Sequence, residues 1–559
     1  MCGIVCAFDL KQSVDEVRPQ ILEMSKRLRH RGPDWSGIFN CDKAILAHER
    51  LAIVDPTSGK QPIISPSGKL ILAANGEIYN HRELRAPYES SYAFKTQSDC
   101  EVILALYEKE GKDFVNKLNG IFAFAIYDES KDEYFIARDH MGIIPLYMGW
   151  DANGTFYVAS ELKALEGVCT KIELFPPGHY FHSNDEVPTK WYTPEWTSYD
   201  DVKDNPTSIE DLHDALSDAV HRQLMSDVPY GVLLSGGLDS SLIVALLKEA
   251  GHEDIRTFSI GFEDIDDEAG SEFEYSDQIV SRFKTQHKKY KVSNQEVLPR
   301  LSEAVMNMAE PMVGQDAVAF YLLSEQVSKH TKVVLSGQGA DEAFAGYFWY
   351  PRMAKENGSE IERFSKHYVD RPHEEYLQTV ASQYQGENHT HNWLNKEFSK
   401  PGADSFIDKV FRTDMTRLIV DDPVKRVDNM TMAWGLEARV PFMDTDLVEW
   451  ALSIPPSLKM KEEGKYPLKN ISRGLLPDSV IDRKKGYFPM PALKYIQGEF
   501  LEFMSDILLS RACINRGVFD QQYINKIIDT PRDYMTALNG SRLWHLALLE
   551  YWFQINVDK

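Results

Sequence analysis

A glycine-rich turn between an apolar strand and a helix carries the strongest chemical signal in the sequence. This turn, Leu234-Ser235-Gly236-Gly237-Leu238-Asp239-Ser240-Ser241, directly follows the apolar run 230–234. Successive backbone N–H groups at such a turn, together with the positive end of the helix behind them, form a cradle for phosphate. The serine hydroxyls add donors, and Asp239 can hold Mg²⁺. The turn lacks the Walker A pattern GxxxxGK[ST], so the sequence predicts a phosphate site of another kind.

The second residue, Cys2, can serve as a nucleophile if Met1 is removed. Its own α-amino group, with an ordinary pKa of about 7.7–8.0, could then accept the thiol proton near neutral pH. Taken alone, this cysteine would be incidental, and the hypothesis depends on the residues that accompany it. The other five cysteines are sparse and form no CxxC pair, so we expect neither a zinc site nor disulfides.

The first third of the chain has the sequence pattern of short strands. Residues 1–190 contain many β-type runs separated by turn residues, with helical patterns at 17–28 and 98–110. We expect an α+β layered domain there. Residues 191–207 are polar, carry two prolines and show no clear period, so they are predicted to form a linker.

From residue 208 to the end at 559, strands and helices alternate at first, and after about 345 the chain is mostly helical. This alternation favours a parallel, doubly wound sheet. Its predicted strands are 230–234, 257–262, 287–292 and 332–335. Ligands of such sheets bind beyond the carboxyl ends of the strands, at the point where the strand order reverses. The phosphate turn follows the first of these strands.

Composition excludes several classes of protein. The chain has 559 residues, with 61 Lys and Arg against 85 Asp and Glu, a net charge of −24. So acidic a chain is a poor non-specific binder of nucleic acid or anionic membrane. No run of about 18 apolar residues suggests a membrane span, and the N-terminus lacks the features of a signal peptide. We expect a cytoplasmic protein whose partners are small molecules.

Motifs in the first third resemble the class II glutamine amidotransferase domain, which has an N-terminal-nucleophile fold of layered αββα type. The motifs are Met1-Cys2-Gly3-Ile4, His30-Arg31-Gly32-Pro33-Asp34, His48-Glu49-Arg50-Leu51, Asn75-Gly76-Glu77-Ile78-Tyr79-Asn80, and Arg138-Asp139 with Gly142 and Pro145-Leu146-Tyr147. The resemblance implies that Cys2 attacks glutamine, and that Asn75 and the Gly76 N–H form the oxyanion hole. It also implies that Arg50, Asn75, Glu77 and Asp99 bind glutamine.

The phosphate turn resembles the pyrophosphate loop of ATP-pyrophosphatases, and a second loop, Ser336-Gly337-Gln338-Gly339-Ala340-Asp341-Glu342, resembles a segment of asparagine synthetases. The whole chain therefore resembles the glutamine-hydrolysing asparagine synthetase family. The resemblance implies ATP and Mg²⁺, an acyl-adenylate, an internal ammonia tunnel, and allows a homodimer. The implied ATP-binding residues are Leu234, Ser235, Gly236, Gly237, Asp239, Ser240, Ile260, Ser336 and Gly337. Asp239 and Asp341 would hold the metal, and Gln338, Asp341 and Lys469 would lie at the acceptor and adenylate site. A solvated surface lysine is an equal alternative for Lys469.

The acceptor of the amide nitrogen stays open between two carboxylates. Gln338 stands where aspartate-specific relatives carry Glu, and residues 308–317 stand where those relatives have a Thr- and Arg-containing acceptor segment. Four segments of the second half, residues 310–312, 336–342, 421–428 and 485–489, resemble instead those of the N-acetylglutaminylglutamine amidotransferases, which make an osmolyte. Aspartate, the usual acceptor of the family, and a peptide-like carboxylate are both retained as hypotheses.

Overall fold

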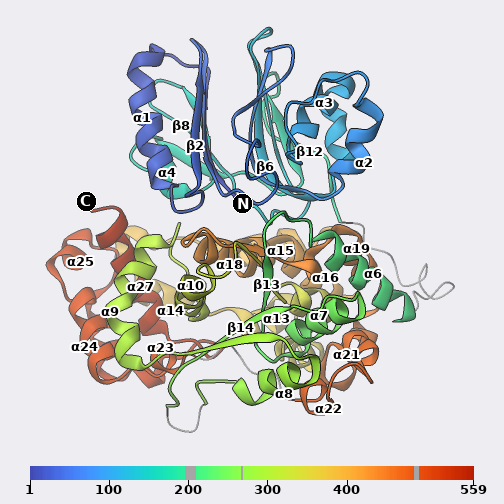
Figure 1. Ribbon diagram of the computed structural model, residues 1–559. Helices are drawn as coiled ribbons and strands as arrows, with labels where there is room; N and C mark the ends of the chain where they lie inside the picture. The colour runs from blue at the N-terminus through green and yellow to red at the C-terminus, as the bar shows by residue number, and fades with distance from the viewer. Residues whose placement is uncertain (195–208, 266–268, 404, 484–489, 559) are drawn as a thin grey trace.

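The computed structural model describes residues 1–194, 209–265, 269–403, 405–483 and 490–558. Two parts are stacked on each other, with the N-terminus between them (Figure 1). The predicted linker, 191–207, falls mostly on residues 195–208, which lie outside the described ranges. Along those ranges no helix is both long and apolar enough to cross a membrane.

The first part contains two six-stranded sheets. One sheet has the strand order β10 (Lys171–Leu174), β8 (Tyr147–Trp150), β9 (Phe156–Ala159), β1 (Gly3–Phe8), β3 (Ala44–Arg50), β2 (Trp35–Asn40). The other has the order β12 (Thr189–Lys190), β11 (His179–His182), β7 (Glu133–Arg138), β6 (Gly120–Asp128), β5 (Leu70–Ile78), β4 (Ile63–Ile64). The strand pairings within both sheets are antiparallel.

Helices cover the outer faces of these sheets and complete four layers (Figure 1). The helices α1 (Val14–Arg27) and α4 (Leu162–Leu165) cover the first sheet, and α2 (His81–Arg85) and α3 (Glu101–Glu110) cover the second. The first turn of α1 is closed by a capping box of Ser13 and Glu16, and its apolar stripe packs on β1 and β3. The layered αββα prediction and its two helices are confirmed.

The second part contains a parallel sheet of five strands. Its order is β15 (Gln286–Lys291), β14 (Arg256–Gly261), β13 (Tyr230–Leu233), β16 (Val333–Leu335), β17 (Glu437–Arg439). Four of these strands are those that the sequence predicts, and the chain reverses direction across the sheet between β13 and β16. The doubly wound prediction is confirmed, and its switch point lies where the two predicted loops begin.

Helices pack on both faces of this sheet. Val232 of β13 joins the core under α7, whereas its neighbour Leu233 joins the core under α10. The other side chains of the strands alternate in the same way because successive residues point to opposite faces. The first helices of this part are α6 (Ile209–Arg222), α7 (Leu238–Glu249), α8 (Phe273–Phe283), α9 (Asn294–Asn307), α10 (Asp316–Val327) and α11 (Ala340–Phe344).

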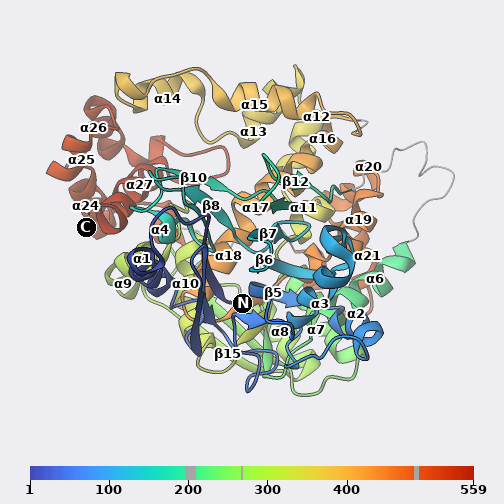
Figure 2. The same cartoon turned by 90° about the horizontal axis from the view of Figure 1, so that it is seen from above.

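The rest of the chain is helical, as predicted. Helices α12 (Trp349–Lys355), α13 (Glu360–Tyr368), α14 (His373–Thr379) and α15 (His389–Phe398) form a ridge along one side (Figure 2). The others are α16 (Phe406–Thr413), α17 (Ile419–Asp421), α18 (Pro423–Met432), α19 (Thr445–Leu452), α20 (Pro456–Lys459), α21 (Tyr466–Ser472), α22 (Asp478–Ile481), α23 (Pro491–Lys494), α24 (Gly498–Leu508), α25 (Arg511–Arg516), α26 (Gln521–Asp529) and α27 (Arg542–Asn556).

Candidate active sites

The first candidate site surrounds Cys2, which is buried just before β1. The backbone N–H of Cys2 donates to Asn75 Oδ1 at 2.6 Å, and its Sγ lies 3.8 Å from the carbonyl oxygen of Leu51. The side-chain amide of Asn75 is held in turn by Ser160 Oγ at 3.4 Å. Strands β1 and β5 thus bring together a thiol and an amide that are 73 positions apart in the sequence.

Other predicted glutamine-site residues are held rigidly around this pair. The Arg50 guanidinium donates to the carbonyl oxygens of Val54 and Asp55 at 3.0 and 2.7 Å. Asp99 accepts from the backbone N–H of Ile78 at 2.7 Å, beside the Asn75-Gly76 segment of β5. Gly76 has φ +150°, and a Cβ there would lie 2.1 Å from the carbonyl oxygen of Ile121, so only glycine fits.

The side chain of Glu77 lies next to residues of the second part of the chain. Its carboxylate lies 3.7 Å from the Arg439 guanidinium, which comes from strand β17 of the second part. Burial, followed by the negative charges of Glu437 and Asp99, raises the pKa of Glu77 well above its usual value. Arg439 also binds Glu437 at 2.6 Å, and the terminal ammonium of Met1 forms an ion pair with the same carboxylate. The predicted contact of Glu77 with glutamine therefore stays a prediction.

The electrostatics around Cys2 favour a neutral thiol. Burial raises the pKa of the Cys2 thiol above its ordinary value, and the nearby positive charges only partly oppose this effect. A neutral thiol is a weak nucleophile, so attack on a carbonyl requires a base at the site.

A buried histidine beside this site makes the stability of the fold sensitive to acid. His48 Nε2 lies 2.9 Å from the carbonyl oxygen of Ala74, and burial lowers the pKa of His48 to about 3. An unfolded chain binds a proton at this histidine below pH about 6.5, whereas the folded chain does not, so stability falls as pH drops from about 6.5 towards 3.

We expect His48→Gln to weaken this dependence, because an amide keeps a donor for Ala74 and does not titrate. Between pH 7.5 and 5.5 the variant should lose about 1.4 kcal/mol less unfolding free energy than the wild type. Urea unfolding at the two pH values measures the difference. Equal losses of unfolding free energy in both proteins would show that His48 does not cause the acid dependence of stability.

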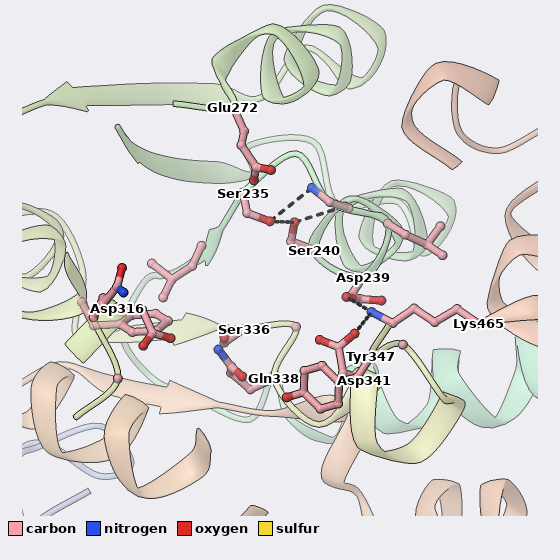
Figure 3. A pocket seen from close by; sticks show the side chains of 18 of the residues that line it. Ser235, Asp239, Ser240, Glu272, Asp316, Ser336, Gln338, Asp341, Tyr347 and Lys465 are labelled. Carbon is pink, nitrogen blue, oxygen red and sulfur yellow. Dashed lines mark hydrogen bonds and ion pairs between the residues drawn. The ribbon is translucent and has the colours of Figure 1, made fainter. Parts of the chain in front are cut away.

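The second candidate site is a cavity of about 760 Å³ at the carboxyl edge of the parallel sheet. Both predicted loops line it, one after β13 and one after β16 (Figure 3). Ser235 Oγ accepts from the backbone N–H of Gly237 at 3.1 Å and lies 3.1 Å from Ser240 Oγ. The loop therefore opens α7 with its N-terminal N–H groups and hydroxyls at the cavity, as a phosphate cradle requires.

A lysine that the sequence analysis did not name lies at the centre of this site. Lys465 Nζ is 2.6 Å from Asp239 Oδ2 and 2.6 Å from Asp341 Oδ1, so one cation joins the two loops (Figure 3). Although burial favours the neutral amine, the two carboxylates raise the pKa of Lys465 above its usual value, and it stays charged. Lys465 has a left-handed backbone (φ 55°) just before α21. The turn that precedes it, Glu462-Glu463-Gly464, is the sequence signal from which Lys465 could have been predicted.

The other predicted residues of the second site are spread around the cavity. Leu234, Ile260, Ser336, Gly337, Gln338 and Lys469 are among its lining residues. Lys469 is half-buried, and its Nζ donates to the carbonyl oxygen of Glu462 rather than to a carboxylate of the two loops. Gly236 is not among the described lining residues. It has φ +76°, and a Cβ there would lie 2.5 Å from the Ser276 nitrogen, so this glycine lets the loop pack on α8.

One wall of the cavity is formed by part of the predicted acceptor segment, residues 308–317. Val313, Gly314, Gln315 and Asp316 line the cavity. Arg426 of α18 also lines it and lies 3.0 Å from Asp316 Oδ1. A side chain at position 314 would meet Arg426, because a Cβ there would lie 2.4 Å from its guanidinium. This wall therefore presents both signs of charge to a ligand.

Both halves of the chain match the profiles of known protein families. The profile described as glutamine amidotransferase domain matches residues 1–192, and the profile described as asparagine synthase matches residues 211–554. Together they define a two-site amidotransferase. Asparagine synthetase B (glutamine-hydrolysing) of Escherichia coli strain K12 is 39% identical over 507 residues, which cover 87% of this chain and 82% of that protein.

Relatives from other kingdoms are similar over most of their length. A probable asparagine synthetase of Schizosaccharomyces pombe is 36% identical, covering 87% of this chain and 84% of that protein. Asparagine synthetase 2 of Oryza sativa subsp. japonica is 34% identical, covering 100% of this chain and 87% of that protein. This chain belongs to the asparagine synthase family, and the resemblance found in its motifs is confirmed.

Proposed function

We propose that this chain is a glutamine-hydrolysing asparagine synthetase, which converts L-aspartate, L-glutamine, ATP and water to L-asparagine, L-glutamate, AMP and diphosphate. The observation that carries the proposal is the Lys465 ammonium held between Asp239 and Asp341, where both loops meet a large cavity. The similarity to glutamine-hydrolysing asparagine synthetases, over most of both chains, supports it.

Glutamine would be hydrolysed at Cys2 through a thioester. With Met1 removed, the α-amino group of Cys2 takes the thiol proton, and the sulfur attacks the amide carbon of glutamine. Asn75 and the Gly76 N–H would stabilise the oxygen that becomes negative. The C–N bond then breaks, ammonia leaves with the transferred proton, and water hydrolyses the thioester to glutamate.

Aspartate would be activated in the cavity. A side-chain carboxylate oxygen of aspartate attacks the α-phosphorus of ATP, and diphosphate leaves. The loop residues Ser235, Gly237 and Ser240 bind the departing diphosphate, and Lys465 balances its charge. Ammonia then attacks the acyl carbon, AMP takes the bonding electrons of the broken C–O bond, and one proton is released.

Asp239 and Asp341 suit a Mg²⁺ ion as well as a lysine. Both carboxylates reach the same Lys465 nitrogen, so they converge on one point. Across the described residues no group of three or more His, Cys, Asp or Glu could hold a metal by itself. This matches Mg²⁺ bound with ATP, which takes one or two carboxylates and completes its shell with phosphate and water. When bound, it would neutralise phosphate charge.

The test is diphosphate release with ATP, Mg²⁺ and glutamine, with L-aspartate in one vessel and N-acetylglutaminylglutamine in another. We expect release and asparagine formation with aspartate, which would show that Gln338 replaces the Glu of relatives. Release with the dipeptide alone would contradict the assigned acceptor. The second acceptor is favoured by Gln338, by the predicted acceptor segment and by the other segments of the second half that resemble N-acetylglutaminylglutamine amidotransferases.

We also propose a cytoplasmic location and no nucleic-acid or membrane partner, in line with the net charge of −24. A homodimer remains a prediction, which light scattering of the purified protein would test.

A further inference from the structure

Helix α18 touches both candidate sites within one turn. Arg426 lines the ATP cavity, whereas Asp428, two residues later, binds Arg31 of the first part. Two such residues of an α-helix point about 200° apart, to opposite sides. A movement of α18 therefore changes contacts at both sites.

At the glutaminase end, one arginine joins α18 to the nucleophile. The Arg31 guanidinium donates two parallel hydrogen bonds to Asp428, each of 2.9 Å, and its Nε donates to the backbone carbonyl of Cys2 at 2.9 Å. Both side chains are buried, with exposed fractions of 0% and 3%. A planar guanidinium fixed along two edges cannot turn without breaking one set of bonds, so a shift of Asp428 is passed on to the backbone of Cys2. Glu161 of the first part also binds Arg31, at 3.1 Å.

At the cavity end, α18 holds both ends of the acceptor segment. Arg426 binds Asp316, near the end of the segment, at 3.0 Å. Asn429 Oδ1 accepts from the backbone N–H of Ala309 at 2.9 Å, and Lys425 Nζ lies 2.6 Å from Glu310 Oε1. A ligand placed against this segment therefore acts on α18 through three side chains.

We propose that Asp428 is a positioning residue that couples glutamine hydrolysis at Cys2 to occupation of the acceptor side of the cavity. This inference rests on the proposed function. When an acceptor and ATP occupy the cavity, they hold the acceptor segment and α18 in place. Asp428 then passes this constraint through Arg31 to the backbone of Cys2. Ammonia is then formed fastest when an acceptor is present to use it.

The test compares glutamate release from glutamine alone with release in the presence of ATP, Mg²⁺ and L-aspartate. In the wild type we expect kcat/KM for glutamine to rise at least about fivefold with these ligands, the lower range of coupling between sites. In Asp428→Asn, which keeps the shape but loses the charge, the rise should be under about twofold. Asp428→Glu keeps the charge and should retain most of the rise.

Two controls separate coupling from folding. Diphosphate release from ammonium chloride, ATP and aspartate should be as fast in Asp428→Asn as in the wild type. Tyr192→Phe removes another bond across the same interface, from Tyr192 to Glu449 Oε1 at 2.9 Å, without touching α18, and should keep the full rise.

Three results would overturn the proposal: no rise in the wild type, a full rise in Asp428→Asn, or an equal loss in Asp428→Glu and Asp428→Asn. Failure of the proposed function would look different. In that case the wild type would release no diphosphate with aspartate from either nitrogen source.

Discussion

Cys2→Ala is expected to lose glutamine-dependent asparagine synthesis by at least about 10³-fold, because the thioester forms on the Cys2 thiol. Synthesis from ammonium chloride should stay within about twofold of the wild type, because Cys2 has no contact with the cavity. Coupled assays of diphosphate and glutamate with each nitrogen source measure both effects.

Cys6→Ala is the matched control. Cys6 is a buried thiol of β1, four residues along the chain, and lies in the core between the sheets. It should keep both activities. Equal loss of the two activities in Cys2→Ala would contradict the assignment of separate sites.

Lys465→Met is expected to lose diphosphate release by about 10²–10³-fold with either nitrogen source, the size seen when one preorganised charge is removed. Without the ammonium, Asp239 and Asp341 would lose the cation that both carboxylates contact, and their repulsion of the phosphates of ATP would increase. Glutamate release from glutamine alone should continue, because Lys465 lies outside the Cys2 site. Initial rates of diphosphate and glutamate release measure the two effects.

Two further lysines sharpen this test. Lys469→Met removes the lysine that the family resemblance named, and Lys461→Met removes an exposed one nearby. We expect the loss to be at least about tenfold greater for Lys465→Met than for Lys469→Met, because Lys465 alone of these contacts both loops. A larger loss for Lys469→Met would return the role to the residue that the motif predicted.

Much of the fold could be predicted because its signals are local. Strands β13, β14 and β16, the turn at Ser235 and the loop at Ser336 have apolar runs and turn residues next to one another in the sequence. The family resemblance put Cys2 and Asn75 in one site, and the two residues are hydrogen-bonded, while their roles stay predictions. The domain boundary at about 190–208 stays a prediction.

Lys465 and the neighbours of Glu77 could not be predicted in this way. Lys465 depends on a left-handed backbone turn that brings a lysine near the C-terminal end to loops more than 100 residues earlier. The contact of Glu77 with Arg439 depends on how the two parts pack, and no periodic pattern reports that. Long-range ion pairs carry no local signature, because the same charged residues also suit a solvated surface.

The buried ion pairs between the two parts limit how such enzymes can be recombined. Arg31 with Asp428 places one buried charge in either half, and Arg439 of the second half lies 3.7 Å from the buried carboxyl of Glu77 in the first. A chimaera that joins one half to the other half of a distant relative would leave a buried charge unmatched unless both members travelled together, and such a charge is strongly destabilising. Exchange of acceptor specificity between relatives should therefore proceed by changes in the acceptor segment, with the halves inherited as one unit.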